Sequence, residues 1–161
     1  PHAKGRTVQL VTEVDVDGAR VWEGRSTYLA RGKGETDAPS GDRPPAMPSG
    51  FPAAQWSLAA DLGREYAAVS GDVNPIHLSA LTAKPMGFPQ AIAHGMWSYA
   101  RVMAALGRHA SGPVTSHVWF RKPILLPSRV DLVVDTTGIP NVAGLRSARR
   151  PDVEHLVLTV S

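Results

Sequence analysis

Residues 66–77 read YAAVSGDVNPIH and place the end of one helix and the start of another only a few positions apart. Gly71 is well placed to end the first helix, because glycine readily adopts the left-handed conformation that closes many helices. Asn74-Pro75 is typical of an N-cap followed by proline at the first helical position, so a second short helix is expected from Pro75 to about Lys84. The first helix is predicted from apolar residues spaced i, i+4 and i+7, namely Leu62, Tyr66 and Val69.

Asp72 and His77 leave the tight corner between these two helices. Asn74 must be extended because a proline follows it, and His77 then falls at about the third position of the second helix. A carboxylate and an imidazole can therefore converge on one small molecule, such as a water. Acid–base catalysis needs such a pair, one group taking a proton as the other supplies one. We predict that Asp72 and His77 are catalytic, although an Asp after Gly also forms turns without any catalytic role.

A third helix, from Gly95 to about Arg108, is apolar on nearly all sides, which predicts that it is buried. Its first amides have no partner inside the helix and carry partial positive charge. Gly95 has no side chain, so a ligand oxygen can approach its N–H closely, as a developing enolate oxygen requires. His94, directly before it, is either a ligand contact or a histidine hydrogen-bonded within the protein.

Both flanks of this helical region read as β-strands. Apolar alternation in residues 8–16 and 20–30 around the turn Asp17-Gly18 predicts a hairpin. Residues 32–55, rich in Gly, Pro and Ser, predict a linker. A buried helix followed by antiparallel strands indicates an α+β fold with the sheet curled around the helix. The later strands are expected near residues 115–120, 129–136, 143–149 and 155–160.

The composition excludes several classes of protein. The absence of cysteine excludes disulfides and cysteine-ligated zinc, and it fits a cytoplasmic location. No apolar run approaches the roughly 20 residues that a membrane span needs. The formal net charge is only +3 and the basic residues are scattered, so we expect no nucleic-acid partner. The one dense basic group, Arg146, Arg149 and Arg150, is predicted to be a solvated loop, with an anionic ligand such as a nucleotide phosphate as the alternative. Neither a dinucleotide fingerprint nor a calcium loop is present, so we predict no cofactor and no metal.

The octapeptide Ser70 to His77 resembles the hydratase motif of the MaoC-like dehydratases, the type 2 (R-specific) enoyl-CoA hydratases of the hot-dog superfamily. His94-Gly95-Met96 also resembles that family, as does Phe120-Arg-Lys-Pro123 before an apolar strand. The resemblance covers about Trp56 to Val160. It implies an α+β hot-dog fold, in which an antiparallel sheet wraps around a central helix. It also implies reversible syn hydration of trans-2-enoyl thioesters to (3R)-hydroxyacyl thioesters.

The resemblance also implies roles for individual residues. Carried over by motif position, Asp72 and His77 hold and activate the catalytic water, and the Gly95 amide binds the thioester carbonyl oxygen. Asn74 shapes the corner, and Gly71 and His94 are included among the residues expected at the substrate-binding site. The substrate is expected to be a thioester of coenzyme A or of acyl carrier protein.

Residues 1–31 resemble strands of a preceding hot-dog unit rather than the start of the unit at residues 56–161. Some members of the family fuse two such units, so the chain resembles a double-hot-dog protein that lacks most of its N-terminal unit. We therefore expect three segments: strands at 1–31, a linker at 32–55 and a catalytic domain at 56–161. The expected assembly is a homodimer or another pairing of two hot-dog units, with no membrane involved.

Two other functions stay open at this point. Hot-dog proteins include thioesterases, which hydrolyse the thioester itself, although the intact D-x-N-P-x-H corner favours a lyase. A non-catalytic subunit that binds acyl thioesters is the third candidate. The presence of both Asp72 and His77 disfavours it.

Overall fold

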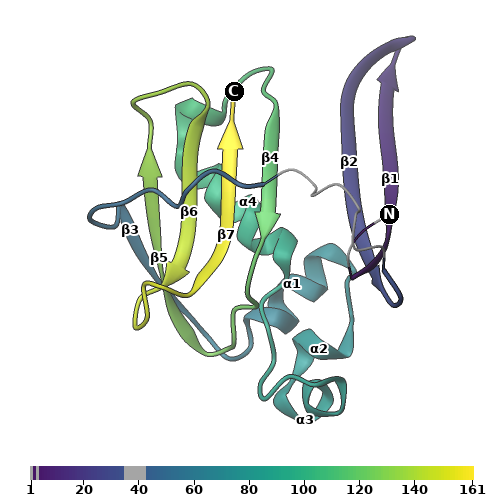
Figure 1. Cartoon of the computed structure of the whole chain (residues 1–161), viewed down its shortest axis with the longest axis vertical. Helices are drawn as coiled ribbons and strands as arrows, with labels where there is room; N and C mark the ends of the chain where they lie inside the picture. The colour runs from purple at the N-terminus through teal and green to yellow at the C-terminus, as the bar shows by residue number, and fades with distance from the viewer. Residues whose placement is uncertain (1, 3, 35–42) are drawn as a thin grey trace. The chain divides into compact units, whose positions relative to one another are not determined.

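The computed structural model describes all residues except 1, 3 and 35–42 (Figure 1). The chain forms two units, Pro1–Arg43 and Pro44–Ser161. The first unit contains an antiparallel hairpin of β1 (Gly5–Val16) and β2 (Ala19–Arg31), which confirms the predicted hairpin. Its turn residues Asp17 and Gly18 both have positive φ, 50° and 79°. Residues 35–42 of the expected linker lie outside the described residues, and the expected division into three segments stays a prediction.

The second unit contains one five-stranded antiparallel sheet with the strand order β3-β5-β6-β7-β4. The four strands that follow the helices lie close to the predicted ranges. The fifth strand, β3, was not predicted and begins inside the expected linker. A strand of five residues beside prolines and glycines offers too little alternation to be recognised, and its pairing with β5 defines it. The strands are β3 (Ala54–Leu58), β4 (Ser116–Phe120), β5 (Ser128–Asp135), β6 (Asn141–Ser147) and β7 (Glu154–Val160).

The helices lie between β3 and β4 in the chain. The single helix predicted from Pro75 to Lys84 is wrong, because the segment is divided at Ser79. This residue is extended, with φ −161°, and its Oγ accepts the N–H of Thr82 at 3.2 Å, which caps a new helix. No helix in the described part of the chain is long and apolar enough to cross a membrane. The helices are α1 (Leu62–Ser70), α2 (Pro75–Leu78), α3 (Ala80–Ala83) and α4 (Gly95–Leu106), with 3-10 turns η1 (Lys84–Met86) and η2 (Gly107–Ala110).

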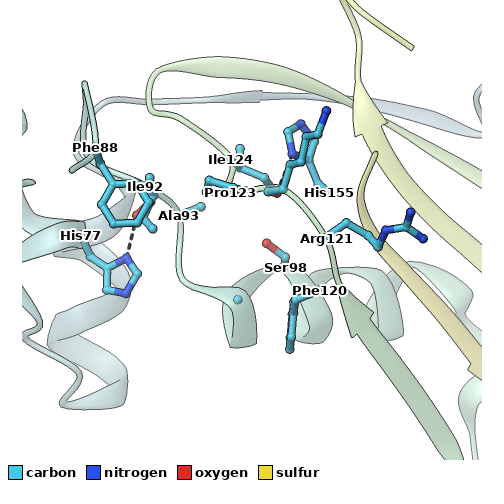
Figure 2. Close-up of a pocket in the computed structure, with 12 residues that line it drawn as sticks. His77, Phe88, Ile92, Ala93, Ser98, Phe120, Arg121, Pro123, Ile124 and His155 are labelled. Atoms are coloured by element: carbon cyan, nitrogen blue, oxygen red, sulfur yellow. Dashed lines mark hydrogen bonds between the residues drawn. The ribbon is translucent and has the colours of Figure 1, made fainter. Parts of the chain in front are cut away.

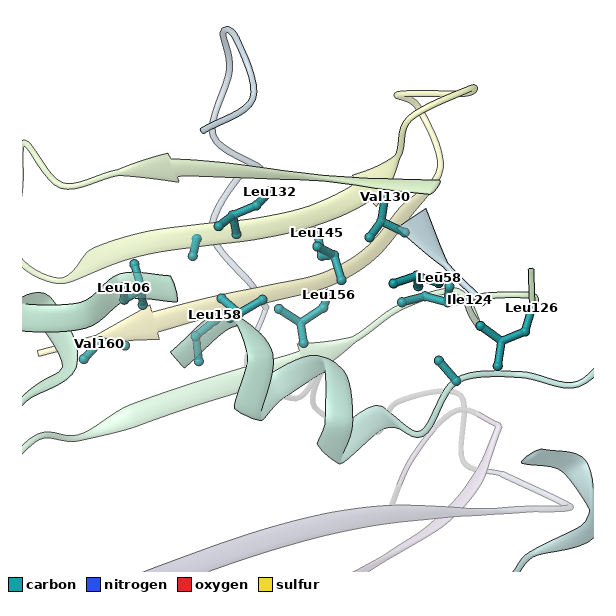
Figure 3. Packing of buried hydrophobic residues seen from close by; sticks show 13 residues of the cluster. Leu58, Leu106, Ile124, Leu126, Val130, Leu132, Leu145, Leu156, Leu158 and Val160 are labelled. Atoms are coloured by element: carbon teal, nitrogen blue, oxygen red, sulfur yellow. The ribbon is translucent and has the colours of Figure 1, made fainter. Parts of the chain in front are cut away.

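The core lies between one face of the sheet and the inner face of α4 (Figure 3). Val102 and Leu106 of α4 are buried against apolar side chains of β5, β6 and β7. Leu145, Leu156 and Leu158 are fully buried there, at 0% exposure. An antiparallel sheet packed on one long helix confirms the predicted α+β class. The same packing fixes the first residue of α4 beside the sheet.

The prediction that α4 is buried on nearly all sides is wrong for this chain. Met96 is 56% exposed, and Ala100, Ala104 and Ala105 are exposed as well. Only one face of a helix can contact one sheet, and composition alone does not show whether a second layer covers the other face.

The arginine group that was predicted to be a solvated loop is only partly one. Arg149 and Arg150 are exposed in the turn before β7. Arg146, however, lies in β6 and is half-buried, and its guanidinium donates to the carbonyl oxygen of Gly50 at 3.1 Å.

Candidate active site

The corner after α1 is held by short-range hydrogen bonds. Gly71 ends α1 with φ 74°, and its N–H donates to the carbonyl of Ala67 at 2.9 Å. The N–H of Asp72 donates to Ser70 Oγ at 3.2 Å. The carboxylate of Asp72 accepts the N–H of Asn74 at 3.2 Å through Oδ1, so one oxygen supports the turn and Oδ2 remains for other contacts.

His77 lies in α2, directly after this corner. Asn74 caps the helix as predicted, because its Oδ1 accepts the N–H of Ile76 at 3.3 Å. The imidazole is buried, and its Nδ1 lies 2.8 Å from the carbonyl oxygen of Ile92, a bond that Figure 2 shows as a dashed line. A carbonyl can only accept, so Nδ1 has the proton and Nε2 of the neutral ring has a lone pair. The N–H of Ile92 donates in turn to the carbonyl of Ile76 at 3.0 Å.

The surroundings of His77 favour this neutral form. Burial lowers the pKa of His77 from its ordinary value of 6.5, and the neighbouring His94 lowers it further. The hydrogen bond to Ile92 and the charge of Asp72 raise the pKa, but they do not cancel the effect of burial. His77 is therefore a base that is unprotonated at neutral pH.

His94 brings a second imidazole to the same place. Its ring stacks on that of His77, with centroids 3.6 Å apart and planes 24° apart. Its Nε2 lies 3.0 Å from the carbonyl oxygen of Asp72 and 3.8 Å from the Asp72 carboxylate. One ring nitrogen of His77, one of His94 and a carboxylate oxygen of Asp72 lie within 4.8 Å of one another, and a water between Asp72 and His77 can bridge such a spacing.

Two histidines and one aspartate are also residue types that bind metal ions, and among the described residues these three lie close enough together to do so. Two observations favour water over a metal ion. The Nε2 of His94 already donates to a backbone carbonyl. Moreover, a nitrogen lone pair lies in the plane of its ring, and two stacked ring planes 3.6 Å and 24° apart do not meet at one metal ion close to both rings.

A pocket opens beside His77 and runs over the start of α4 (Figure 2). Gly95, the first residue of α4, lines it together with Ser98 of the next turn. Phe120 forms part of the wall, and a methyl group on Gly95 would come within 3.1 Å of its ring. Gly95 thus places the N-terminus of α4, whose first amides have no partner inside the helix, at the wall of this pocket.

The structure separates the predicted site residues into two groups. Asp72, His77 and His94 come together, and Gly95 lines the same pocket as His77. Gly71 and the side chain of Asn74 instead maintain the backbone of the corner, and neither lines this pocket. The catalytic and binding roles of all six residues stay predictions.

His155 is a pocket residue whose role the sequence did not reveal. It is buried in β7, lines the same pocket as His77, and its Nδ1 donates to the carbonyl oxygen of Lys122 at 3.0 Å. Burial lowers its pKa, although bonds to the backbone of Lys122 and Pro123 raise it. Only the pairing of β4 with β7 brings position 155 beside residues 121 and 122, so no local sequence signal could have found it.

Comparison with known proteins agrees with this architecture. The family model described as MaoC like domain matches residues 50–155. The chain belongs to the MaoC-like family. Its fold is accordingly the hot-dog fold, as predicted, with the five-stranded sheet packed on α4.

The MaoC-like chain is 39% identical over 137 residues to 3-hydroxyacyl-thioester dehydratase X of Mycobacterium tuberculosis, covering 83% of this chain and 48% of that protein. The crystal structure of HtdX from the same organism matches with a TM-score of 0.79 and 34% identity, over 99% of this chain and 60% of that one. The (R)-specific enoyl-CoA hydratase of Rhodospirillum rubrum is 33% identical over 78 residues, covering 46% of this chain and 54% of that protein. The matches thus span about half the length of these two relatives.

Proposed function

We propose that the protein catalyses the reversible hydration of trans-2-enoyl thioesters to (3R)-hydroxyacyl thioesters. The observation that supports this most is the group of Asp72, His77 and His94, in which a carboxylate oxygen and one nitrogen of each ring lie within 4.8 Å of one another. His77 from this group also lines the pocket that exposes the start of α4. A base, a carboxylate that can orient water and a ready oxyanion site are the three components that hydration requires.

In the proposed reaction, a water lies between the Asp72 carboxylate and Nε2 of His77. The water oxygen forms a bond to C3 of the substrate while one of its protons passes to Nε2. The π electrons of the double bond move toward the thioester carbonyl, and the amide of Gly95 stabilises the resulting enolate oxygen. His77 then returns the proton to C2, which regenerates the neutral ring. Because one imidazole serves both steps from one side, addition is syn.

The names of relatives support the choice of substrate class. One relative is named a 3-hydroxyacyl-thioester dehydratase and another an (R)-specific enoyl-CoA hydratase. These names motivate the proposals of a thioester substrate and of R stereochemistry. The acyl group would enter the pocket lined by Phe88, Ile92 and Phe120, with coenzyme A or acyl carrier protein as its carrier.

The test uses a series of trans-2-enoyl-CoA substrates of increasing chain length. We expect loss of the enoyl thioester absorbance without release of free thiol, and a product of R configuration by chiral chromatography. Release of thiol in step with substrate loss would identify a thioesterase instead. Binding of the enoyl-CoA without either change would identify a non-catalytic binding subunit.

A further inference from the structure

His94 is the most enclosed polar side chain of the candidate active site. Only 3% of the side chain is exposed, compared with 54% for Asp72. On one side its ring stacks on His77, and on another it packs against Tyr66 at 4.9 Å between centroids, with the planes tilted by 59°. Neither His94 nor Asp72 is among the residues that line the pocket with His77, but Asp72 is open to solvent and His94 is not.

The hydrogen bonds of His94 define its tautomer. Nε2 lies 3.0 Å from the backbone carbonyl of Asp72, which can only accept, so Nε2 has the proton. Nδ1 then has no proton and has a free lone pair. This nitrogen is buried and has no hydrogen-bond partner among the described residues. Both nitrogens are thus unavailable to a substrate, one because its proton is donated and the other because it is enclosed.

The backbone of His94 is fixed as firmly as its ring. Its carbonyl accepts the N–H of Ser98 at 3.2 Å and the hydroxyl of Ser98 at 3.3 Å, which anchors it to α4. The N–H of the preceding Ala93 donates to the carbonyl of Ile124 at 2.9 Å. His94 therefore forms a rigid link between the core of the unit and the exposed turn at Asp72.

From these contacts we propose that His94 is a positioning residue rather than a substrate contact. Its Nε2–H holds the main chain of Asp72, and its ring supports the face of His77, so that carboxylate and imidazole keep the spacing of one water. The proposal rests on the proposed hydration reaction. His94 then affects turnover only through Asp72 and His77 and does not affect the affinity for substrate.

Two substitutions separate the two contacts in the full chain. His94→Phe keeps an aromatic ring against His77 and Tyr66 but loses the donor to Asp72. His94→Gln keeps an amide donor but loses the ring. We expect His94→Phe to lower kcat by about 10²-fold, the usual cost of a displacement of about 1 Å in an active site, with KM changed by less than about threefold. His94→Gln should restore part of the loss. The half-buried His109, in η2, provides the control His109→Phe, which should leave both constants unchanged.

The kinetic outcomes distinguish positioning from binding. A rise in KM with unchanged kcat would show that His94 binds substrate and would overturn the proposal. Wild-type kinetics in both variants would overturn it as well.

A second measurement does not depend on activity. In His94→Phe, hydrogen exchange of the Asp72 and Asn74 amides, which donate to Ser70 Oγ and Asp72 Oδ1, should accelerate, whereas in His109→Phe it should keep the wild-type rate. In the wild-type protein, nitrogen-15 NMR of the histidine rings should find the proton of His94 on Nε2. Unchanged exchange at the Asp72 turn, or a proton on Nδ1 of His94, would refute the positioning role. If the wild-type protein does not hydrate enoyl thioesters, the proposed function fails, and these two measurements still test the position of His94.

Discussion

At the level of single residues, Asp72 and His77 differ sharply in their surroundings. Asp72 is more than half exposed, whereas His77 is buried and hydrogen-bonded to Ile92. An exposed carboxylate can bind and orient a water, and a buried neutral imidazole can take its proton. This contrast is the reason for proposing that Asp72 orients the water and His77 accepts its proton.

Removing either group tests this division. Asp72→Asn and His77→Gln should each lower kcat by about 10²–10⁴, the usual contribution of one acid–base group. Because both act on one water, the double variant should be little slower than the slower single variant. Near-normal turnover in either single variant, measured with the best enoyl-CoA, would contradict the assignment.

The pH dependence of hydration tests the protonation state of His77. Burial lowers the pKa of His77 below 6.5, and only the neutral ring can accept a proton from water. The value of kcat/KM should therefore stay constant as pH falls to about 6.5 and decrease only when pH falls through the lower pKa of the folded protein. The residual activity of His77→Gln should lack this decrease. If the decrease in kcat/KM had its midpoint above pH 7, burial would not be what sets the pKa of the catalytic base.

At the level of secondary-structure elements, the position of His77 depends on how closely α1 approaches α2. Gly63 of α1 is buried against the backbone of α2, and a methyl group built on it overlaps the carbonyl oxygen of His77. The guanidinium of Arg64 donates to the carbonyl of Leu78 at 3.0 Å and joins the two helices further. These contacts restrict residue 63 to glycine.

We expect Gly63→Ala to lower the free energy of unfolding by about 1–3 kcal/mol, the usual cost of overpacking a close contact. It should also lower kcat, because α2 must move away together with His77. Chemical denaturation and turnover measure the two effects. The matched control is Gly138→Ala, since a methyl group on Gly138 meets nothing within 4 Å. If the two variants had equal free energies of unfolding and equal kcat, the close approach of α1 to α2 would not be required for stability or turnover.

At the level of the whole molecule, the hairpin of β1 and β2 exposes many large apolar side chains. Two strands without a further layer cannot bury them, and exposed apolar strands favour pairing with another sheet. The exposed residues include Val8, Leu10, Val11, Val14, Val16, Val21, Trp22, Tyr28 and Leu29. In the hot-dog sheet, β3 and β4 are the edge strands.

We therefore predict that the active assembly contains two hot-dog units and that residues 1–31 contribute to it. A second sheet that pairs with these strands would be uncovered without them, so deleting residues 1–31 should lower solubility, increase the binding of a hydrophobic dye and reduce turnover. Light scattering should find at least two hot-dog units in the active wild-type species. A deletion variant that is monomeric, soluble and fully active would exclude this arrangement.

The sequence by itself determined the features that depend on neighbours within a few residues. Gly71 ends α1 in the left-handed conformation, Asn74 caps α2, and Asp17-Gly18 forms the hairpin turn, all as predicted. Capping and turn formation involve hydrogen bonds over two to four positions, so the residue types alone specify them. The octapeptide at residues 70–77 also pointed to the family that the comparisons identify.

Only the tertiary structure decided which distant residues meet. In the folded protein, His94 stacks on His77, and β3 pairs with β5. The pairing of β4 with β7 places His155 at the same pocket as His77. The tertiary structure also left one face of α4 exposed, although the composition of the helix predicted burial. These outcomes depend on contacts between elements far apart in the chain. Spacing along the sequence does not encode such contacts, because a face is buried only when another element packs against it.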